Sequence, residues 1–183
     1  MLDAACAAGA VVGTDISGFG DPDYLGVAAK HRASVVATHI RLKPRVPDPE
    51  PVYDDLVADV DAFLRDRAAR AAAAGLAPEQ VCVDAGLDLG KTPAMSAVLL
   101  RESAVLARHG NVLLLSASNK RYIGDLLGLG IDERREASLA SVAYGVMQGC
   151  RVVRVHDVAG SVKVCRMVEA ILARRAEVRE RRS

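Results

Sequence analysis

The chain has 183 residues and a formal net charge of +1, with 24 basic and 23 acidic side chains. This balance gives no overall field for nucleic acid, and an aromatic content of 3 % with no Trp excludes the stacking platforms of single-strand binders. The length suits one domain, the four cysteines form no C-x-x-C pair, and no apolar run approaches the roughly 18 residues of a membrane span. We therefore expect a cytoplasmic protein.

Five short apolar runs alternate along the chain with segments of helical period. The apolar runs cover residues 11–15, 35–39, 81–84, 113–115 and 152–157. Helices are expected over residues 22–31, 53–74, 93–108, 122–127, 134–147 and 161–175. Continuously apolar strands are typical of parallel sheets, which are buried on both faces. The alternation predicts an α/β fold of successive βαβ units, with the chemically capable residues at the strand ends meeting on one rim.

Between the second and third runs lies a segment of different composition. Residues 41–52 hold four prolines and the basic trio Arg41, Lys43 and Arg45. Proline at this density prevents both helix and ladder formation, so we expect a stiff, extended loop on the active rim. The loop is either a solvated crossover or a lid that collects anions. The charged end of the chain, residues 174–182, is expected to be a solvated helix terminus.

Motifs at the strand ends carry a family resemblance. Residues 84–91, DAGLDLGK, resemble the D-P-G-x-G-F-G-K loop of dihydropteroate synthase. SNK at 118–120 is similar to that family's S-R-K turn, and RVHDV at 154–158 is similar to its R-V-H-D-V strand end. GTDI at 13–16 stands where the family has I-N-D-[IV], and His39 where it has its M-H strand. The match runs in order to about Ile171.

The resemblance implies a parallel (β/α) TIM-barrel fold. The family joins a 6-hydroxymethyl-7,8-dihydropterin diphosphate to p-aminobenzoate in folate biosynthesis and releases pyrophosphate. About five of the eight βα units are present, so we expect residues 1–183 to be a single pterin-binding domain that lacks the N-terminal part. The family also implies Mg²⁺, whose usual ligand lies in that missing part. The loop over residues 41–51 suggests a divergent paralogue branch of the kind found in actinobacteria.

The resemblance assigns roles to residues at four of the strand ends. Asp84 is the carboxylate that would accept hydrogen bonds from the pterin edge; the alternative is a helix cap or a loop salt bridge. Lys120 would reach a pterin carbonyl or ring nitrogen; the alternative is a surface lysine. The expected substrate-binding set is Thr14, Asp84, Ser118, Lys120, Arg154 and His156, and the expected catalytic set is Lys120, Arg154 and His156.

Arg154 and His156 alternate along one strand, which predicts that both side chains point to the same face. A guanidinium beside an imidazole can hold a diphosphate, because the fork of arginine matches phosphate oxygens. The structural alternative is that Asp157 or Asp15 pairs with them. Asp157 is expected to orient a neighbour, and His39 is expected to be a packed core histidine. Nothing in the sequence has zinc-site spacing, and no metal ligand is assigned.

Four residues depart from the family pattern: one replaces a pterin-contacting Asn, and the other three lie toward the region expected to hold p-aminobenzoate. Thr14 replaces the family's Asn, and Asn119 replaces the Arg of its S-R-K turn. Leu89 replaces the Phe of the glycine-rich loop, and Asp88 replaces its second Gly. A carboxylate at position 88 is expected to face the p-aminobenzoate end and to repel an anionic benzoate. The pattern predicts an intact pterin-diphosphate half-site beside an altered second pocket.

Five strands cannot close an eight-stranded barrel, so two sheet edges and an apolar interior would be exposed. The chain is therefore either a truncated reading frame or a half-barrel that forms a homodimer to cover its edges. Its expected function is a dihydropteroate synthase-type transferase with doubtful activity in this short form. The alternative is a catalytically inactive pterin- or diphosphate-binding regulatory or assembly subunit. A pterin-dependent methyltransferase is disfavoured, since its donor has no diphosphate for Arg154 and His156 to hold.

Overall fold

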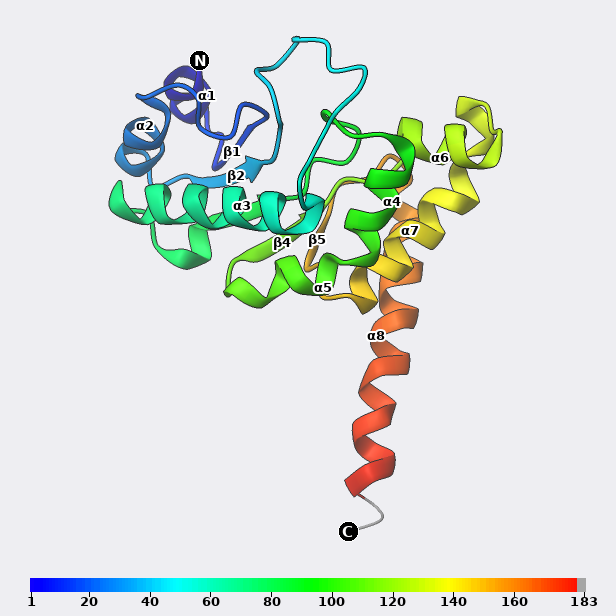
Figure 1. The fold of residues 1–183 in the computed structure, drawn as a ribbon. Coiled ribbons are helices and arrows are strands. Elements are labelled where there is room, and N and C mark those ends of the chain that lie inside the picture. The colour runs from blue at the N-terminus through cyan, green and yellow to red at the C-terminus, as the bar shows by residue number, and fades with distance from the viewer. Residues whose placement is uncertain (181–183) are drawn as a thin grey trace.

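Five parallel strands form a curled half-barrel in the computed structural model (Figure 1), which describes residues 1–180 apart from the side chains of His109 and of residues 174–180. The strands pair in chain order, each with the next. Their bounds are β1 Val12–Asp15, β2 Ser34–Thr38, β3 Val81–Asp84, β4 Val112–Leu115 and β5 Val152–Val153. The expected incomplete TIM-barrel architecture is confirmed.

Eight helices accompany the strands within the described residues. They are α1 Leu2–Ala7, α2 Tyr24–Lys30, α3 Leu56–Ala73, α4 Pro93–Arg101, α5 Ser103–Leu106, α6 Arg121–Leu127, α7 Arg135–Met147 and α8 Val158–Glu180. Helix α3 begins where the Asp55 side chain accepts hydrogen bonds from the backbone of Val57 and Ala58. It ends before Gly75, whose φ of +93° gives the left-handed stop that the sequence predicts.

The two faces of the sheet differ in what covers them. Alternate strand residues on the outer face, such as Val35, Val83 and Leu113, are buried in two apolar clusters under the helices. On the inner face, Val12 and Thr14 of β1 are exposed. In the described part of the chain, β1 and β5 each pair with a single strand, which leaves one free edge on each side of the half-barrel.

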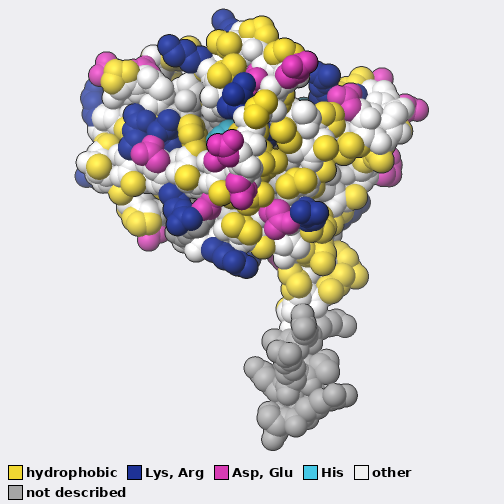
Figure 2. Space-filling model, in the orientation of Figure 1, with side chains coloured by type: hydrophobic (Ala, Val, Ile, Leu, Met, Phe, Trp, Pro, Cys, Tyr) yellow, Lys and Arg dark blue, Asp and Glu magenta, His cyan; other side chains and the backbone are white. Residues whose placement is uncertain are grey.

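Helix α8 runs away from the body of the molecule (Figure 1). Its described part carries apolar side chains into solvent, as Figure 2 shows where the helix leaves the body. Met167 and Ile171 are among the exposed ones, whereas Val168 is buried. No helix among the described residues is both long enough and apolar enough to cross a membrane. The side chains of the charged end, residues 174–182, lie outside what the structure describes.

The structure differs from the expected elements at three places. The expected helix over residues 93–108 breaks at Glu102 into α4 and α5, where the Ser103 hydroxyl donates to the Leu99 carbonyl at 3.2 Å and competes with the helical backbone. Strand β5 ends at Val153 rather than at residue 157, although the Arg154 N–H still donates to the Leu115 carbonyl at 2.9 Å. Helix α1 was not expected.

Gly86 follows β3 at a point where two backbones meet. Its φ is +65°, and a Cβ built there would lie 1.9 Å from the carbonyl oxygen of His39. Gly86→Ala is therefore expected to lower the free energy of unfolding by more than about 3 kcal/mol, through steric overlap and a strained backbone. Gly26→Ala is the matched control, since Gly26 lies in α2 with nothing within 4 Å of its Cβ position. Gly26→Ala should raise the free energy of unfolding by about 0.5–1 kcal/mol. Both changes are measured by denaturant titration. Similar effects of the two changes would contradict this account.

Candidate functional site

Asp84 ends the central strand β3 and is 7 % exposed. Its Oδ1 accepts a hydrogen bond from the Gly86 backbone at 2.8 Å, and within the described residues nothing donates to Oδ2. Burial raises the pKa of this carboxyl, while the positive charges of Lys120, Lys91 and Arg154 act in the opposite direction. Asp84 is therefore a buried carboxylate with a free oxygen, surrounded by cations.

Two loops on the rim are joined beside Asp84. Lys120, which follows β4, donates from Nζ to the Leu87 carbonyl at 3.0 Å. In the other direction, the Asp88 carboxylate accepts hydrogen bonds from the backbone of Arg121 at 2.7 Å and of Tyr122 at 3.1 Å. These bonds run between the loop after β3 and the first turn of α6. They bring Lys120 close enough to Asp84 to act on its pKa.

The Asp88 carboxylate has hydrogen-bond partners that the sequence does not predict. It accepts from the backbone N–H groups at the start of α6, and it also contacts the Ser96 hydroxyl at 3.4 Å. Unsatisfied N–H groups at a helix start attract a nearby carboxylate, and that Asp88 repels a benzoate stays a prediction. Its φ of +67° shows that a position where the family has Gly keeps the left-handed backbone here.

Arg154 and His156 line one cavity of about 440 Å³ with Ser118 and Lys120. Both basic residues are exposed, and neither pairs with a carboxylate among the described residues. Their suggested partners have other contacts. Asp157 accepts from Arg135 Nε at 2.8 Å and from the Gly160 backbone at 2.8 Å. Asp15 accepts from Ser17 and from the Phe19 backbone. The cavity therefore has unpaired cationic capacity.

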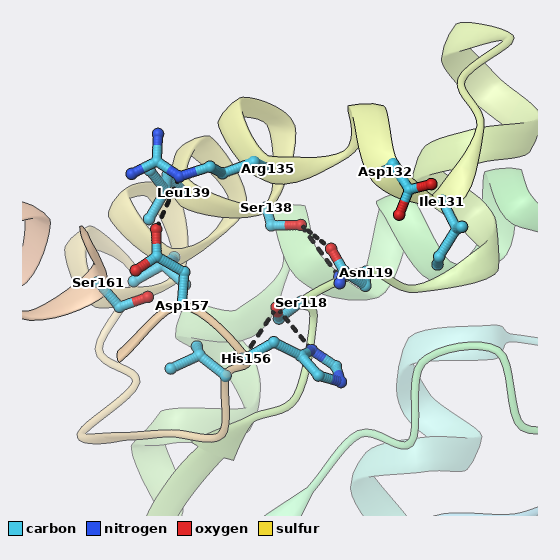
Figure 3. Close-up of a pocket in the computed structure, with 12 residues that line it drawn as sticks. Ser118, Asn119, Ile131, Asp132, Arg135, Ser138, Leu139, His156, Asp157 and Ser161 are labelled. Carbon is cyan, nitrogen blue, oxygen red and sulfur yellow. Dashed lines mark hydrogen bonds and ion pairs between the residues drawn. The ribbon is translucent and has the colours of Figure 1, made fainter. Parts of the chain in front are cut away.

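Ser118 orients the His156 ring (Figure 3). The Ser118 hydroxyl accepts from the His156 backbone N–H at 3.2 Å and lies 3.0 Å from His156 Nδ1. The hydroxyl has one proton and two acceptor lone pairs, so in the tautomer in which it donates to Nδ1 the ring proton is on Nε2. Nε2, the ring nitrogen away from Ser118, has no partner among the described residues. Ser118 acts through His156 in this geometry, rather than as an independent ligand.

Thr14 lies apart from the Lys120 turn. It is on the inner face of β1 and lines, with Arg154, a larger open hollow of about 640 Å³. The hydroxyl donates and accepts through a single oxygen, whereas an amide presents a separate donor and acceptor in a fixed plane. The structure therefore brings Ser118, Lys120, Arg154 and His156 together around one cavity, with Lys120 and Arg154 close enough to Asp84 to act on its pKa, and leaves Thr14 at the free edge.

The sequence reading assigned no role to Lys91, which forms a buried pair with His39. Lys91 Nζ lies 2.8 Å from His39 Nδ1 and donates to the Leu89 carbonyl at 2.9 Å. Burial, together with the positive charge of Lys91, lowers the pKa of His39 to about 3. Burial also lowers the pKa of Lys91 to about 7, against the attraction of Asp84. His39 is the packed core histidine that was expected, and the signal for Lys91 was its place at the end of the glycine-rich motif.

The proline-rich loop is held by one ion pair within the loop and by one hydrogen bond to the rim. Arg41 Nε donates to Asp48 Oδ2 at 2.6 Å, which closes the loop on itself. The Tyr53 hydroxyl donates to the Gly90 carbonyl at 2.8 Å. Arg41 is therefore neutralised locally, and of the basic trio only Lys43 and Arg45 remain to attract anions.

The residues present do not fit a resident metal. In the part of the chain that the structure describes, no three His, Cys, Asp or Glu side chains are grouped closely enough to hold an ion. The Mg²⁺ that the resemblance implies would therefore need ligands from outside these residues.

A family model described as pterin binding enzyme matches residues 1–156. The dihydropteroate synthase of Escherichia coli K12 is 35 % identical over 165 residues, covering 90 % of this chain and 58 % of the enzyme. A protein named inactive dihydropteroate synthase 2, from Mycobacterium tuberculosis H37Rv, is 38 % identical over 180 residues, covering 93 % of this chain and 55 % of that protein. The chain thus spans a little over half the length of the curated relatives that it matches.

Solved structures agree in fold. The dihydropteroate synthase of Stenotrophomonas maltophilia matches with a TM-score of 0.89 and 38 % identity, covering 94 % of this chain and 65 % of that one. The Xanthomonas albilineans enzyme, solved in complex with 7,8-dihydropteroate, matches with a TM-score of 0.85 and 34 % identity, over 94 % of this chain and 63 % of that one.

The hydrogen bonds from the Asp88 carboxylate to the start of α6 can be tested by substitution. Asp88→Ala removes the acceptor at the start of α6 and keeps a left-handed backbone, so it should cost about 1–2 kcal/mol of unfolding free energy. Asp88→Gly loses the same acceptor but relieves the backbone, so its cost should be smaller by roughly 1 kcal/mol. Asp88→Asn, which keeps an acceptor, is the control. Equal losses for Ala and Gly would show that the backbone at this position is not strained.

The low pKa of His39 predicts a pH-dependent stability. As pH falls from the ordinary histidine value of 6.5 toward about 3, the unfolded chain takes up a proton that the folded chain does not. The free energy of unfolding should therefore fall over this range, by up to about 1.4 kcal/mol per pH unit. His39→Asn leaves an acceptor for Lys91 and should reduce the slope. The control Thr38→Ser, at a buried site without a titratable group, should keep the slope of the parent chain in denaturant titrations.

Proposed function

The chain belongs to the dihydropteroate synthase family of pterin-binding enzymes, and we propose that it carries the pterin and diphosphate half of that transferase site. The substrates of the proposed reaction are 6-hydroxymethyl-7,8-dihydropterin diphosphate and p-aminobenzoate. The observation that supports the proposal is a buried carboxylate next to a cavity lined by basic groups. Asp84 has a free oxygen and is close enough to Lys120 and Arg154 for their charges to act on its pKa, and these two residues line the cavity together with His156.

Each group has a chemical task in this proposal. The free Oδ2 of Asp84 accepts hydrogen bonds from the donor edge of the pterin, and the buried setting excludes competing water. Lys120 has three donors, of which one serves Leu87, so others are free for a pterin carbonyl or ring nitrogen. Arg154 and the Nε2–H of His156 bind the diphosphate oxygens.

The reaction separates charge at the diphosphate. The bond between the pterin methylene carbon and the diphosphate oxygen breaks, and its electron pair leaves on pyrophosphate. The aromatic amine then forms the new carbon–nitrogen bond and loses a proton. Negative charge therefore grows on the leaving group, where Arg154 and His156 stabilise it more in the transition state than in the bound substrate.

A second candidate function is supported by the relatives and by the departures in this chain. One relative with 38 % identity is named an inactive synthase. In this chain Leu89 and Asn119 replace family residues of the second pocket, while the pterin-side groups stay in place. We propose as the alternative that the chain binds pterin diphosphate without turnover, as a regulatory or assembly subunit. A homodimer that covers the free edges of β1 and β5 is compatible with either function.

Calorimetry on the 183-residue chain distinguishes these proposals. Binding of the pterin diphosphate together with p-aminobenzoate-dependent release of pyrophosphate would support the transferase. Binding without pyrophosphate release would support the inactive subunit. If the pterin diphosphate does not bind to a chain that unfolds cooperatively, both proposals are wrong.

Arg154→Ala tests the diphosphate assignment. Loss of a charge-assisted pair should lower the affinity for the pterin diphosphate at least tenfold, or by about 1.4 kcal/mol. The affinity for the bare pterin alcohol should stay nearly unchanged. Arg151→Ala is the matched control, because Arg151 is an exposed arginine at the start of the same chain segment and does not line this cavity. Equal losses for the two ligands would refute the role of Arg154.

A further inference from the structure

Arg134 lies just before α7, outside every motif that the sequence singles out. Its guanidinium donates hydrogen bonds to three backbone carbonyls and, in the part of the chain that is described, pairs with no carboxylate. Nη1 donates to Asn119 O at 3.3 Å and to Lys120 O at 3.2 Å. Nε and Nη2 donate to Leu129 O at 3.3 and 3.2 Å. The planar guanidinium can donate to three acceptors at once in a fixed geometry. A lysine ammonium, on a flexible chain, cannot fix three acceptors relative to one another.

The three carbonyls belong to the two ends of one short element. Asn119 and Lys120 form the turn that leads from β4 into α6, and Leu129 follows the end of α6. The turn is sharp, because Asn119 has a left-handed φ of +56°. Lys120 O also accepts from the Ile123 backbone at 3.2 Å, so it is shared between the helix and Arg134. Arg134 thus holds the peptide groups on both sides of the Lys120 Cα.

A glycine in α6 makes room for this side chain. A Cβ built on Gly124 would lie 2.1 Å from Arg134 Nη2 and 2.5 Å from its Cζ. Glycine inside a helix costs about 1 kcal/mol relative to alanine, and here the guanidinium occupies the space that the missing side chain leaves. Gly124 and Arg134 therefore form one structural unit beneath the Lys120 turn.

We propose that Arg134 is a positioning residue for Lys120. By holding the carbonyls of Asn119 and Lys120, it sets the direction in which the Lys120 side chain leaves the backbone toward Leu87 and Asp84. The consequence for ligands rests on the proposed function, since Lys120 is assigned there to the pterin. The geometric part, the placement of Lys120 Nζ on the Leu87 carbonyl, does not depend on any ligand.

Chemical modification of lysine tests the geometric part. The chain is treated with limiting acetic anhydride, and acetylation at each lysine is measured by mass spectrometry, with the exposed Lys43 as internal reference. In Arg134→Met, Lys120 should react at least threefold faster relative to Lys43, since its amine is released from Leu87. Arg134→Lys should not restore the slow rate. An unchanged Lys120 rate in a folded Arg134→Met chain would overturn the proposal.

A second variant covers the case in which Arg134→Met does not fold. Gly124→Ala introduces a better helix former while displacing the guanidinium, so it should also raise the Lys120 acetylation rate. Gly26→Ala, in α2, is the control and should leave the Lys120 acetylation rate unchanged. Gly128→Ala is unsuitable as a control, because Gly128 has a left-handed φ. A folded Gly124→Ala chain with the parent rate would contradict the proposal.

A double-mutant cycle tests the step from Arg134 through Lys120 to the ligand. Arg134→Met should lower the affinity for the pterin diphosphate about tenfold in the parent chain and not at all in a Lys120→Met background. A purely structural effect would instead lower the affinity by the same factor in both backgrounds. Additive losses would overturn the proposal. If the parent chain does not bind the pterin diphosphate, the proposed function fails, and the acetylation measurement still decides the role of Arg134.

Discussion

The parallel pairing of the five strands is the constraint on which the candidate site depends, because it places every strand end on one rim. Each inter-strand register continues the previous one, so Thr38 lies opposite Asp84, and Asp84 opposite Leu114. The loops that follow these strands must then share a small space above the sheet. Their backbones approach so closely that Gly86 leaves no room for a Cβ beside His39. The hydrogen bonds between the loops exist because parallel pairing makes the loops neighbours.

Charge on the rim is divided between groups that hold the loops and groups that remain free. Asp88, Asp157 and Asp48 each accept hydrogen bonds from nearby backbone or arginine groups. Arg154 and His156 face the cavity without such a partner among the described residues. These three carboxylates therefore have partners within the structure, whereas Arg154 and His156 do not. The local field is therefore suited to a multiply charged anion, although the chain as a whole is almost neutral.

Sequence reasoning recovered what depends on local pattern. Apolar runs located all five strands, and β3 begins and ends where its run does, because a buried parallel strand has a continuous apolar signal. Motif resemblance identified the residues around Asp84. It could not show that the Asp88 carboxylate turns toward α6, since that depends on where another loop ends. The Lys91–His39 pair was missed because its two residues are distant in sequence. The hydrogen bonds of Arg134 were missed because their acceptors are backbone carbonyls, which no side chain in the sequence signals.

The strand registers described above also bear on how the chain reaches this structure. Partners such as Val35 and Val81, or Leu114 and Val152, are separated by whole helices and loops. A large entropic cost of closing these segments must be met before any pair of strands gains stability, so folding of this topology is slow compared with that of a helical bundle. Within the described residues, β1 and β5 each have an edge without a partner strand, and apolar residues lie beside these edges. Unpaired strand edges exposed during slow folding can pair with another chain, so aggregation would compete with folding of this part of the protein.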